Sequence, residues 1–263
     1  MKNLFSLFAI FGLLLGLNAV PLPASALTAV SELRSGDLIR GETHTAVYYL
    51  GEDGFRYVFP SSTVYFSWYA NFDTVQWISD VDLSTIQIGG NVTYKPGSTL
   101  GKIDTDPKTY AIDEGGVLRW VTSEAVASSL YGSNWNTKVV DIPDAFFSNY
   151  DRGSDIEEAN DYNVQQVLAK VASINDDKDL KAPYIVFISD NEYSQTDIMI
   201  SPDRPVKFVN NGSDVHTATA DDLSWGTGSL YTGDHFTRYF RTPGEYDFFC
   251  SYHPEMTGTI TVE

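Results

Sequence analysis

Three residues near the end of the chain carry metal-binding side chains. Cys250, His253 and Met256 stand in the string CSYHPEMTG, and Cys250 is the only cysteine of the sequence. A thiolate, an imidazole and a thioether together suit a metal that alternates between a softer and a harder oxidation state. This set predicts copper cycling between Cu(I) and Cu(II), with one more histidine supplied by an earlier strand. Each residue alone is more often structural, so the metal interpretation depends on their occurring together.

The elements around these residues are predicted to be strands. From Pro183 onward, short apolar segments such as YIVFIS, VKFVNN and EYDFFC alternate with turns at Asn211-Gly212 and Pro243-Gly244. Such spacing favours a small β-sandwich or barrel. Alternation along EYDFFC places Cys250 on the inward face and Phe249 on the outward face.

This segment resembles the cupredoxins, the blue copper proteins that include plastocyanin and amicyanin. The resemblance rests on Gly244-Glu245-Tyr246 running into Cys250, on His253 and Met256 after it, and on the closing strand TGTITVE. The Cys-x-x-His-x-x-Met spacing is the short loop of amicyanin, and the family's upstream histidine matches His216 in NNGSDVHT. The resemblance implies one type 1 copper centre, held by His216, Cys250, His253 and Met256.

The same resemblance implies roles for neighbouring residues. Met256 is expected to be the weak axial ligand that helps to set the reduction potential. Thr217 and Ser251 are expected to tie the strand of His216 to the ligand loop, although the family often has asparagine after its first histidine. Partners and electrons are expected at an apolar rim formed by Phe249, Tyr252 and Pro254. The two remaining histidines, His44 and His235, are expected to bind no metal.

The N-terminal part contains a weak internal repeat. Residues 47–58 and 109–121 both show an aromatic-apolar run, an acidic-glycine turn and then Arg-aromatic-Val. Each pattern predicts a β-hairpin, and the spacing of a little over sixty residues predicts two copies of one unit. A short helix is expected near residues 123–130. The aromatic side chains of this part are expected to fill its core, with stacking on cell-wall sugars as the alternative; they are Tyr48, Tyr49, Tyr57, Tyr65, Phe66, Trp68, Tyr69, Phe72, Trp77, Trp120 and Trp135.

These observations predict a mainly β chain with four segments. Residues 1–26 have a lysine, an apolar run and an Ala-Ser-Ala site, the pattern of a secretory signal peptide. Residues 31–150 form the duplicated β-rich domain of unassigned family and role. Residues 151–181 form an acidic linker with one amphipathic helix, which the string INDDKD is expected to break. Residues 182–263 form the cupredoxin domain.

Composition limits the partners. The formal net charge of −18 argues against binding of nucleic acid, whose phosphates need Lys and Arg. An acidic surface favours a basic docking face on a protein partner, and a merely solvated surface is the alternative. The leader predicts export to the periplasm, the cell surface or the medium, with no membrane span unless the leader is kept as an anchor.

The function predicted from these features is transfer of single electrons between exported redox partners. A copper enzyme is rejected, because a second copper centre needs further histidines and only His44 and His235 remain. Copper delivery is disfavoured, since the chain has no Met-rich or His-rich tract. A surface-attached protein whose N-terminal domain binds wall polymer is the other alternative.

Overall fold

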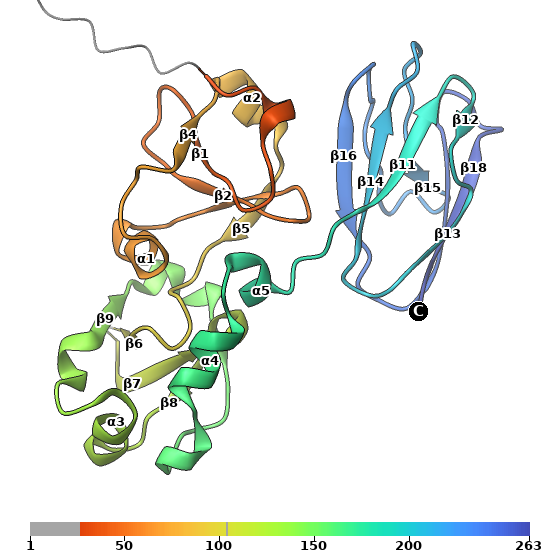
Figure 1. Cartoon of the computed structure of the whole chain (residues 1–263). Coiled ribbons are helices and arrows are strands. Elements are labelled where there is room, and N and C mark those ends of the chain that lie inside the picture. The colour runs from red at the N-terminus through yellow and green to blue at the C-terminus, as the bar shows by residue number, and fades with distance from the viewer. Residues whose placement is uncertain (1–26, 104) are drawn as a thin grey trace, which may run out of the picture.

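The structure is a computed structural model that describes residues 27–103 and 105–263. The expected signal peptide lies outside the described residues. Figure 1 shows an N-terminal part with sheets and helices, and a C-terminal part made of strands. The described part of the chain is mainly β, as the sequence predicts, and its strands form four sheets. No helix within these residues has the length and the apolar character to span a membrane.

The N-terminal part contains two sheets of the same topology. The strands of the first sheet are β1 (Leu38–Arg40), β2 (Tyr48–Leu50), β3 (Arg56–Val58), β4 (Val75–Trp77) and β5 (Ile88–Asn91). Those of the second are β6 (Leu100–Ile103), β7 (Asp106–Asp113), β8 (Val117–Trp120), β9 (Val139–Ile142) and β10 (Asp151–Arg152). The order is β4-β1-β2-β3-β5 in one and β9-β6-β7-β8-β10 in the other. Both have antiparallel central pairs and parallel outer pairs, as expected of a duplicated unit.

Equivalent helices follow the hairpins in the two copies. Helix α1 (Ser62–Trp68) begins after Ser61, and helix α3 (Glu124–Tyr131) begins after Ser123. Each serine side chain accepts a hydrogen bond from the backbone N–H of the third helical residue, a standard N-cap. The short helix expected near residues 123–130 is therefore confirmed. Helix α2 (Asp80–Thr85) completes the first copy, where the second has the 3₁₀ helix η4 (Asp144–Asn149).

The two copies share one hydrophobic core. It joins Tyr49, Tyr57 and Tyr65 of the first copy with Tyr110 and Leu118 of the second. These aromatic rings lie in the core, as the sequence predicts. The prediction is wrong for three aromatics of the first copy, which are exposed, namely Phe66, Phe72 and Trp77.

Residues 151–181, the expected acidic linker, contain two α-helices. Helix α4 (Val164–Lys170) packs Val167 into a core of the second copy, in line with its apolar spacing. Helix α4 ends at Lys170, before the string INDDKD, and that string does not form the expected break but helix α5 (Ile174–Lys178). The reason is local: the Ser173 hydroxyl accepts from the Asp176 backbone N–H, and the Asp176 carboxylate accepts from the Ser173 N–H.

A buried carboxylate joins α5 to the second hairpin. Asp177 is 4% exposed and accepts hydrogen bonds from the Gly115 backbone N–H (2.9 Å) and the Thr93 hydroxyl (3.3 Å). Burial raises the pKa of Asp177 to about 6 from 3.8, although the bond from Gly115 opposes the shift. Because the folded pKa lies above the unfolded one, the protonated form is favoured by folding. Asp177 therefore reduces stability as pH rises from about 4 to about 6.

We expect Asp177→Asn to remove this pH dependence. The neutral amide can still accept from the Gly115 N–H, so the variant should be more stable than the wild type at pH 7, by at most about 3 kcal/mol. The difference in unfolding free energy between the two proteins should shrink toward pH 4. Urea unfolding of both proteins at several pH values measures it, and a difference that stays constant from pH 4 to 7 would contradict the prediction.

The C-terminal part is a sandwich of two sheets. Its strands are β11 (Tyr184–Ser189), β12 (Glu192–Tyr193), β13 (Asp197–Ile200), β14 (Pro205–Asn210), β15 (Thr219–Ala220), β16 (His235–Tyr239), β17 (Gly244–Phe249) and β18 (Thr257–Val262). The sheet orders are β12-β11-β14-β16 and β13-β18-β17-β15. Alternating side chains face inward, and Val186, Phe208 and Phe248 are fully buried between the sheets.

The two parts of the chain contact each other at strand β16. The Gln87 side-chain amide accepts from the Thr237 backbone N–H (2.7 Å) and donates to its carbonyl (3.1 Å), so it pairs with this edge strand as another strand would. Next to it, the Tyr239 hydroxyl donates to the buried carboxylate of Asp53 (2.6 Å). The Tyr57 hydroxyl donates to the same carboxylate oxygen (2.6 Å).

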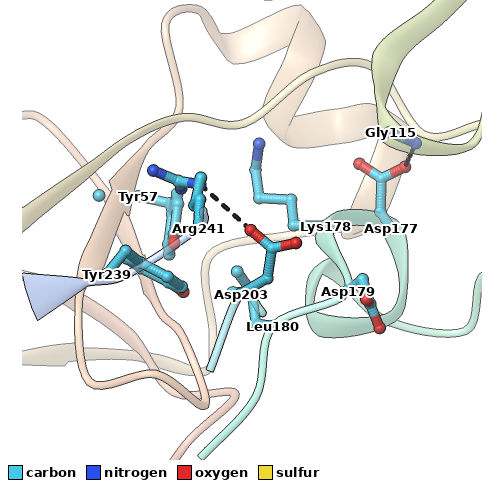
Figure 2. A pocket seen from close by; sticks show the side chains of 10 residues that line it. Tyr57, Gly115, Asp177, Lys178, Asp179, Leu180, Asp203, Tyr239 and Arg241 are labelled. Atoms are coloured by element: carbon cyan, nitrogen blue, oxygen red, sulfur yellow. Dashed lines mark hydrogen bonds and ion pairs between the residues drawn. The ribbon is translucent and has the colours of Figure 1, made fainter. Parts of the chain in front are cut away.

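A polar cleft of about 480 Å³ lies beside this junction. Figure 2 shows Lys178 of α5 projecting into it, near Tyr57 and Tyr239. Burial lowers the pKa of Lys178. Arg241 and Asp203 form an ion pair of 3.2 Å at the side of the C-terminal part. Residues of the N-terminal part, of α5 and of the C-terminal part therefore line the cleft together.

Candidate metal site

Cys250 follows strand β17 and points into the sandwich core. Its side chain is fully buried and forms no disulfide. Phe248, two positions earlier on the same face, is also fully buried, in agreement with the alternation expected for EYDFFC. The end of β17 thus carries the thiol inward, to the end of the sandwich where β17 turns toward β18.

The loop after Cys250 is closed by its own backbone. The His253 N–H donates to the Cys250 carbonyl (3.1 Å), and the Met256 N–H donates to the His253 carbonyl (2.9 Å). The Cys250 N–H in turn donates to the Met256 carbonyl (3.0 Å). Two tight turns therefore fold the loop back and bring His253 beside the thiol. Met256 is 4% exposed within the same core cluster as Cys250.

His216 comes from a separate segment of the chain, between strands β14 and β15. Its backbone pairs with Leu230, donating to the Leu230 carbonyl (3.1 Å) and accepting from the Leu230 N–H (2.8 Å). The imidazole is fully buried. This short bridge places a rigid histidine 34 residues before Cys250 in sequence, but next to it in space.

The three donor atoms form a compact triangle. The Cys250 Sγ atom lies 3.7 Å from His216 Nδ1 and 3.8 Å from His253 Nδ1, and the two nitrogens are 3.2 Å apart. A point equidistant from all three lies about 2.1 Å from each, near the bond lengths of about 2.0–2.3 Å that imidazole and thiolate make to a first-row ion such as zinc. The residues present therefore fit a metal ion, and their chemistry suits copper.

Thr217 and Ser251 connect the two ligand segments. The Thr217 backbone N–H points at the Cys250 Sγ atom (3.4 Å), and the Thr217 hydroxyl oxygen accepts from the Ser251 N–H (2.8 Å). Thr219 extends this network, because its hydroxyl lies 3.1 Å from the hydroxyls of both residues. The network fixes the thiol relative to the segment that carries His216.

Comparison with protein families matches residues 165–262 to the cupredoxin-like domain. The C-terminal domain is a cupredoxin-like domain. The match begins inside α4, before the first strand of the sandwich, β11. The resemblance inferred from the sequence is therefore confirmed for this part of the chain, which also contains a His-Cys-His group that could hold a metal ion.

Solved structures similar to this chain include three copper proteins. A purple cupredoxin from Nitrosopumilus maritimus is 26% identical and aligns over 30% of this chain and 99% of its own, with a TM-score of 0.29. The copper-containing nitrite reductase of Thermus scotoductus SA-01 is 28% identical over 32% of this chain and 23% of its own, with a TM-score of 0.30. The Cu(I) form of a mutant of amicyanin is 22% identical over 31% of this chain and 82% of its own, with a TM-score of 0.29. The comparison with curated proteins finds no match.

One of the three donor residues is accessible at the surface of the cupredoxin-like domain. His253 is partly exposed, whereas His216 is fully buried. Of the three residues expected at the docking rim, Tyr252 is 54% exposed and Pro254 is exposed, while Phe249 is half-buried. The Tyr252 hydroxyl lies 2.8 Å from the Ser229 hydroxyl, so the ring leans toward the neighbouring loop.

The other two histidines lie outside the donor triangle. His44 is exposed in the N-terminal domain. His235 belongs to β16, where burial and the nearby Lys207 lower its pKa. His235 pairs with Val209 of β14 and is half-buried.

Sequence reasoning did not identify two residues around His216. The Tyr193 hydroxyl donates to the Thr217 carbonyl (2.6 Å). An Asp190 carboxylate oxygen lies 3.7 Å from His216 Nε2, and hydrogen bonds from the Asp214 backbone and the Ser213 hydroxyl hold the pKa of Asp190 at about 2. Both residues come from the hairpin β11–β12, and the only sequence signal there is the turn Asp190-Asn191.

Proposed function

We propose that this chain is an exported type 1 copper protein that carries single electrons between redox partners. The observation that supports it most is the triangle of Cys250 Sγ and two histidine Nδ1 atoms within 3.8 Å of one another. A bound copper ion would take one electron from a donor partner, becoming Cu(I), and would return to Cu(II) when an acceptor partner takes that electron. Cys250 would provide the soft thiolate, His216 and His253 the imidazoles, and Met256 a weak thioether donor.

The surroundings of the site suit electron transfer better than turnover of a substrate. The thiol and His216 are sealed in the core, and only His253 among the three donors is partly exposed. Backbone hydrogen bonds within residues 250–256 hold the loop in place, so little rearrangement is needed when the charge changes. A partner would dock over Tyr252 and Pro254, and the net charge of −18 favours a partner with a basic face.

Copper titration tests the proposal directly. Residues 27–263 are produced without metal, and Cu(II) is added while the visible spectrum is recorded. One equivalent should produce an intense thiolate-to-copper absorption that disappears on reduction and returns on oxidation. A protein that stays colourless with excess Cu(II) would contradict the proposal.

Replacement of Met256 tests its assignment as the axial ligand. We expect Met256→Leu to keep the visible absorption, because a leucine fills a similar volume at this buried position. The reduction potential should rise, since the lost thioether is a weak donor that favours Cu(II). A redox titration followed at the visible band measures the shift, and a lower potential than that of the wild type would contradict the assignment.

Exposed aromatic rings favour a second role for the N-terminal domain. Phe66 and Phe72 are 50% and 49% exposed, and both contact the ring of Tyr65. Such a surface can stack on sugars, so we propose attachment to cell-wall polymer as an addition to electron transfer. Sedimentation of the mature chain with purified cell wall tests it, with bound and free fractions compared.

A further inference from the structure

The buried ligand His216 has one ring nitrogen without a partner. Its Nδ1 atom faces the donor triangle, and its Nε2 atom is buried with no hydrogen-bond partner among the described residues. A neutral imidazole whose Nδ1 lone pair faces a metal carries its proton on Nε2. A buried N–H donor without an acceptor costs about 1–3 kcal/mol, so this position calls for an acceptor.

Two polar groups beside the His216 ring, its own backbone and the Asn210 side chain, are already hydrogen-bonded to other groups. The backbone of His216 pairs with Leu230. The Asn210 side chain donates to the carbonyls of Asp214 (2.7 Å) and Leu230 (2.8 Å) and accepts from the Gly212 N–H (2.9 Å). The carboxylate of Asp190 faces the ring, with Oδ1 3.7 Å from His216 Nε2. The distance between these two atoms is longer than the usual length of a charge-assisted N–H···O hydrogen bond by about 1 Å or less.

Asp190 is held where it faces the imidazole. Its Oδ1 atom accepts from the backbone N–H groups of Ser213 (2.8 Å) and Asp214 (3.0 Å), and its Oδ2 atom accepts from the Ser213 hydroxyl (2.8 Å). Gly212 permits this approach, because a Cβ atom there would overlap the carboxylate. The carboxylate is thus anchored to the segment that leads into His216, from a hairpin 26 residues earlier in the chain.

We propose that Asp190 is a positioning residue of the metal centre, whose carboxylate accepts the Nε2–H of His216. This contact would hold the tautomer with Nδ1 directed at the metal and would make the imidazole a stronger donor. An imidazole that is hydrogen-bonded to a negatively charged carboxylate stabilises Cu(II) more than Cu(I). Asp190 therefore lowers the reduction potential of the copper. The inference rests on the proposed function, because it needs copper at the site.

The test compares Asp190→Asn with Asp214→Asn in the full mature chain. The first variant removes the charge at the imidazole and keeps the side-chain shape. The second removes a charge two residues from His216, where the carboxylate makes no hydrogen bond among the described residues. We expect Asp190→Asn to reduce the preference for Cu(II) over Cu(I) about tenfold, which corresponds to a potential about 59 mV higher for one electron. Asp214→Asn should shift the potential by less than a third of this.

Proton NMR of the wild-type Cu(I) protein provides a readout that needs no variant. A hydrogen bond to Asp190 should give the His216 Nε2–H a downfield, slowly exchanging resonance. An Nε2–H that exchanges as fast as that of free imidazole would overturn the proposal, as would equal potentials for the two variants. A wild type that binds no copper would instead overturn the proposed function, and the inference with it; a blue wild type with an unchanged Asp190→Asn potential would overturn the inference alone.

Discussion

Replacing Cys250 with serine should abolish the visible absorption of the copper-loaded protein completely. The band arises from charge transfer between a thiolate and copper, and Cys250 supplies the only thiol of the chain. A serine hydroxyl stays protonated near neutral pH and is a hard donor, so it replaces neither the charge nor the softness of sulfur. Titration of Cu(II) into Cys250→Ser, followed in the visible range, measures the effect.

The control must separate loss of the ligand from loss of the fold. Cys250 is fully buried, so a serine there costs stability unless its hydroxyl finds a partner. The Thr217 N–H, which points at the sulfur at 3.4 Å, can donate to the serine oxygen instead. Far-ultraviolet circular dichroism of the metal-free variant should therefore match the wild type. An intense blue band in the folded variant would show that Cys250 is not a copper ligand.

Replacing Asp53 with alanine should separate the two domains. Asp53 is fully buried, and its carboxylate accepts from the hydroxyls of Tyr57 and Tyr239, the latter from the cupredoxin-like domain. The variant leaves two tyrosine hydroxyls without their acceptor, at about 1–3 kcal/mol each. Urea unfolding should then show two transitions, and trypsin should cleave faster after Lys181, between the domains.

Two further variants serve as a milder change and as a control for Asp53→Ala. Tyr239→Phe removes one hydrogen bond but keeps the ring stacked on Phe55, with centroids 5.8 Å apart, so it should cost about 1 kcal/mol. Glu52→Ala changes the neighbouring exposed acid and should leave domain docking intact. All three variants should keep the copper absorption, because the substitutions lie away from the donor triangle. A single unfolding transition for Asp53→Ala at the wild-type position would show that the carboxylate does not hold the domains together.

Local patterns predicted much of the fold. Alternation along EYDFFC and the turns around it predicted the sandwich strands, because side-chain direction in a strand depends only on neighbours along the chain. The repeated hairpin motif predicted two equivalent units, and the sheets of the two copies have the same strand order. The string INDDKD is an exception. Its sequence predicts a break, but reciprocal hydrogen bonds between Ser173 and Asp176 start helix α5 there.

The donor set of the metal site was also visible in the sequence. Cys250, His253 and Met256 are close along the chain, so a single loop carries them wherever the rest of the protein lies. His216 was assigned only through the family resemblance, since residue spacing alone does not choose among distant histidines. The structure brings His216, Cys250 and His253 together.

By itself, then, the sequence determined the chemistry of the site. It places a loop with the metal-binding side chains of Cys250, His253 and Met256 after a β-strand, in a mainly β and acidic chain. Tertiary structure alone decided which distant groups meet, namely Asp190 with His216, Gln87 with Thr237, and Asp53 with Tyr239. The last two pairs are 150 and 186 residues apart. Contacts at such range leave no periodic trace in the sequence, because they depend on how whole sheets pack and not on the residues beside them in the chain.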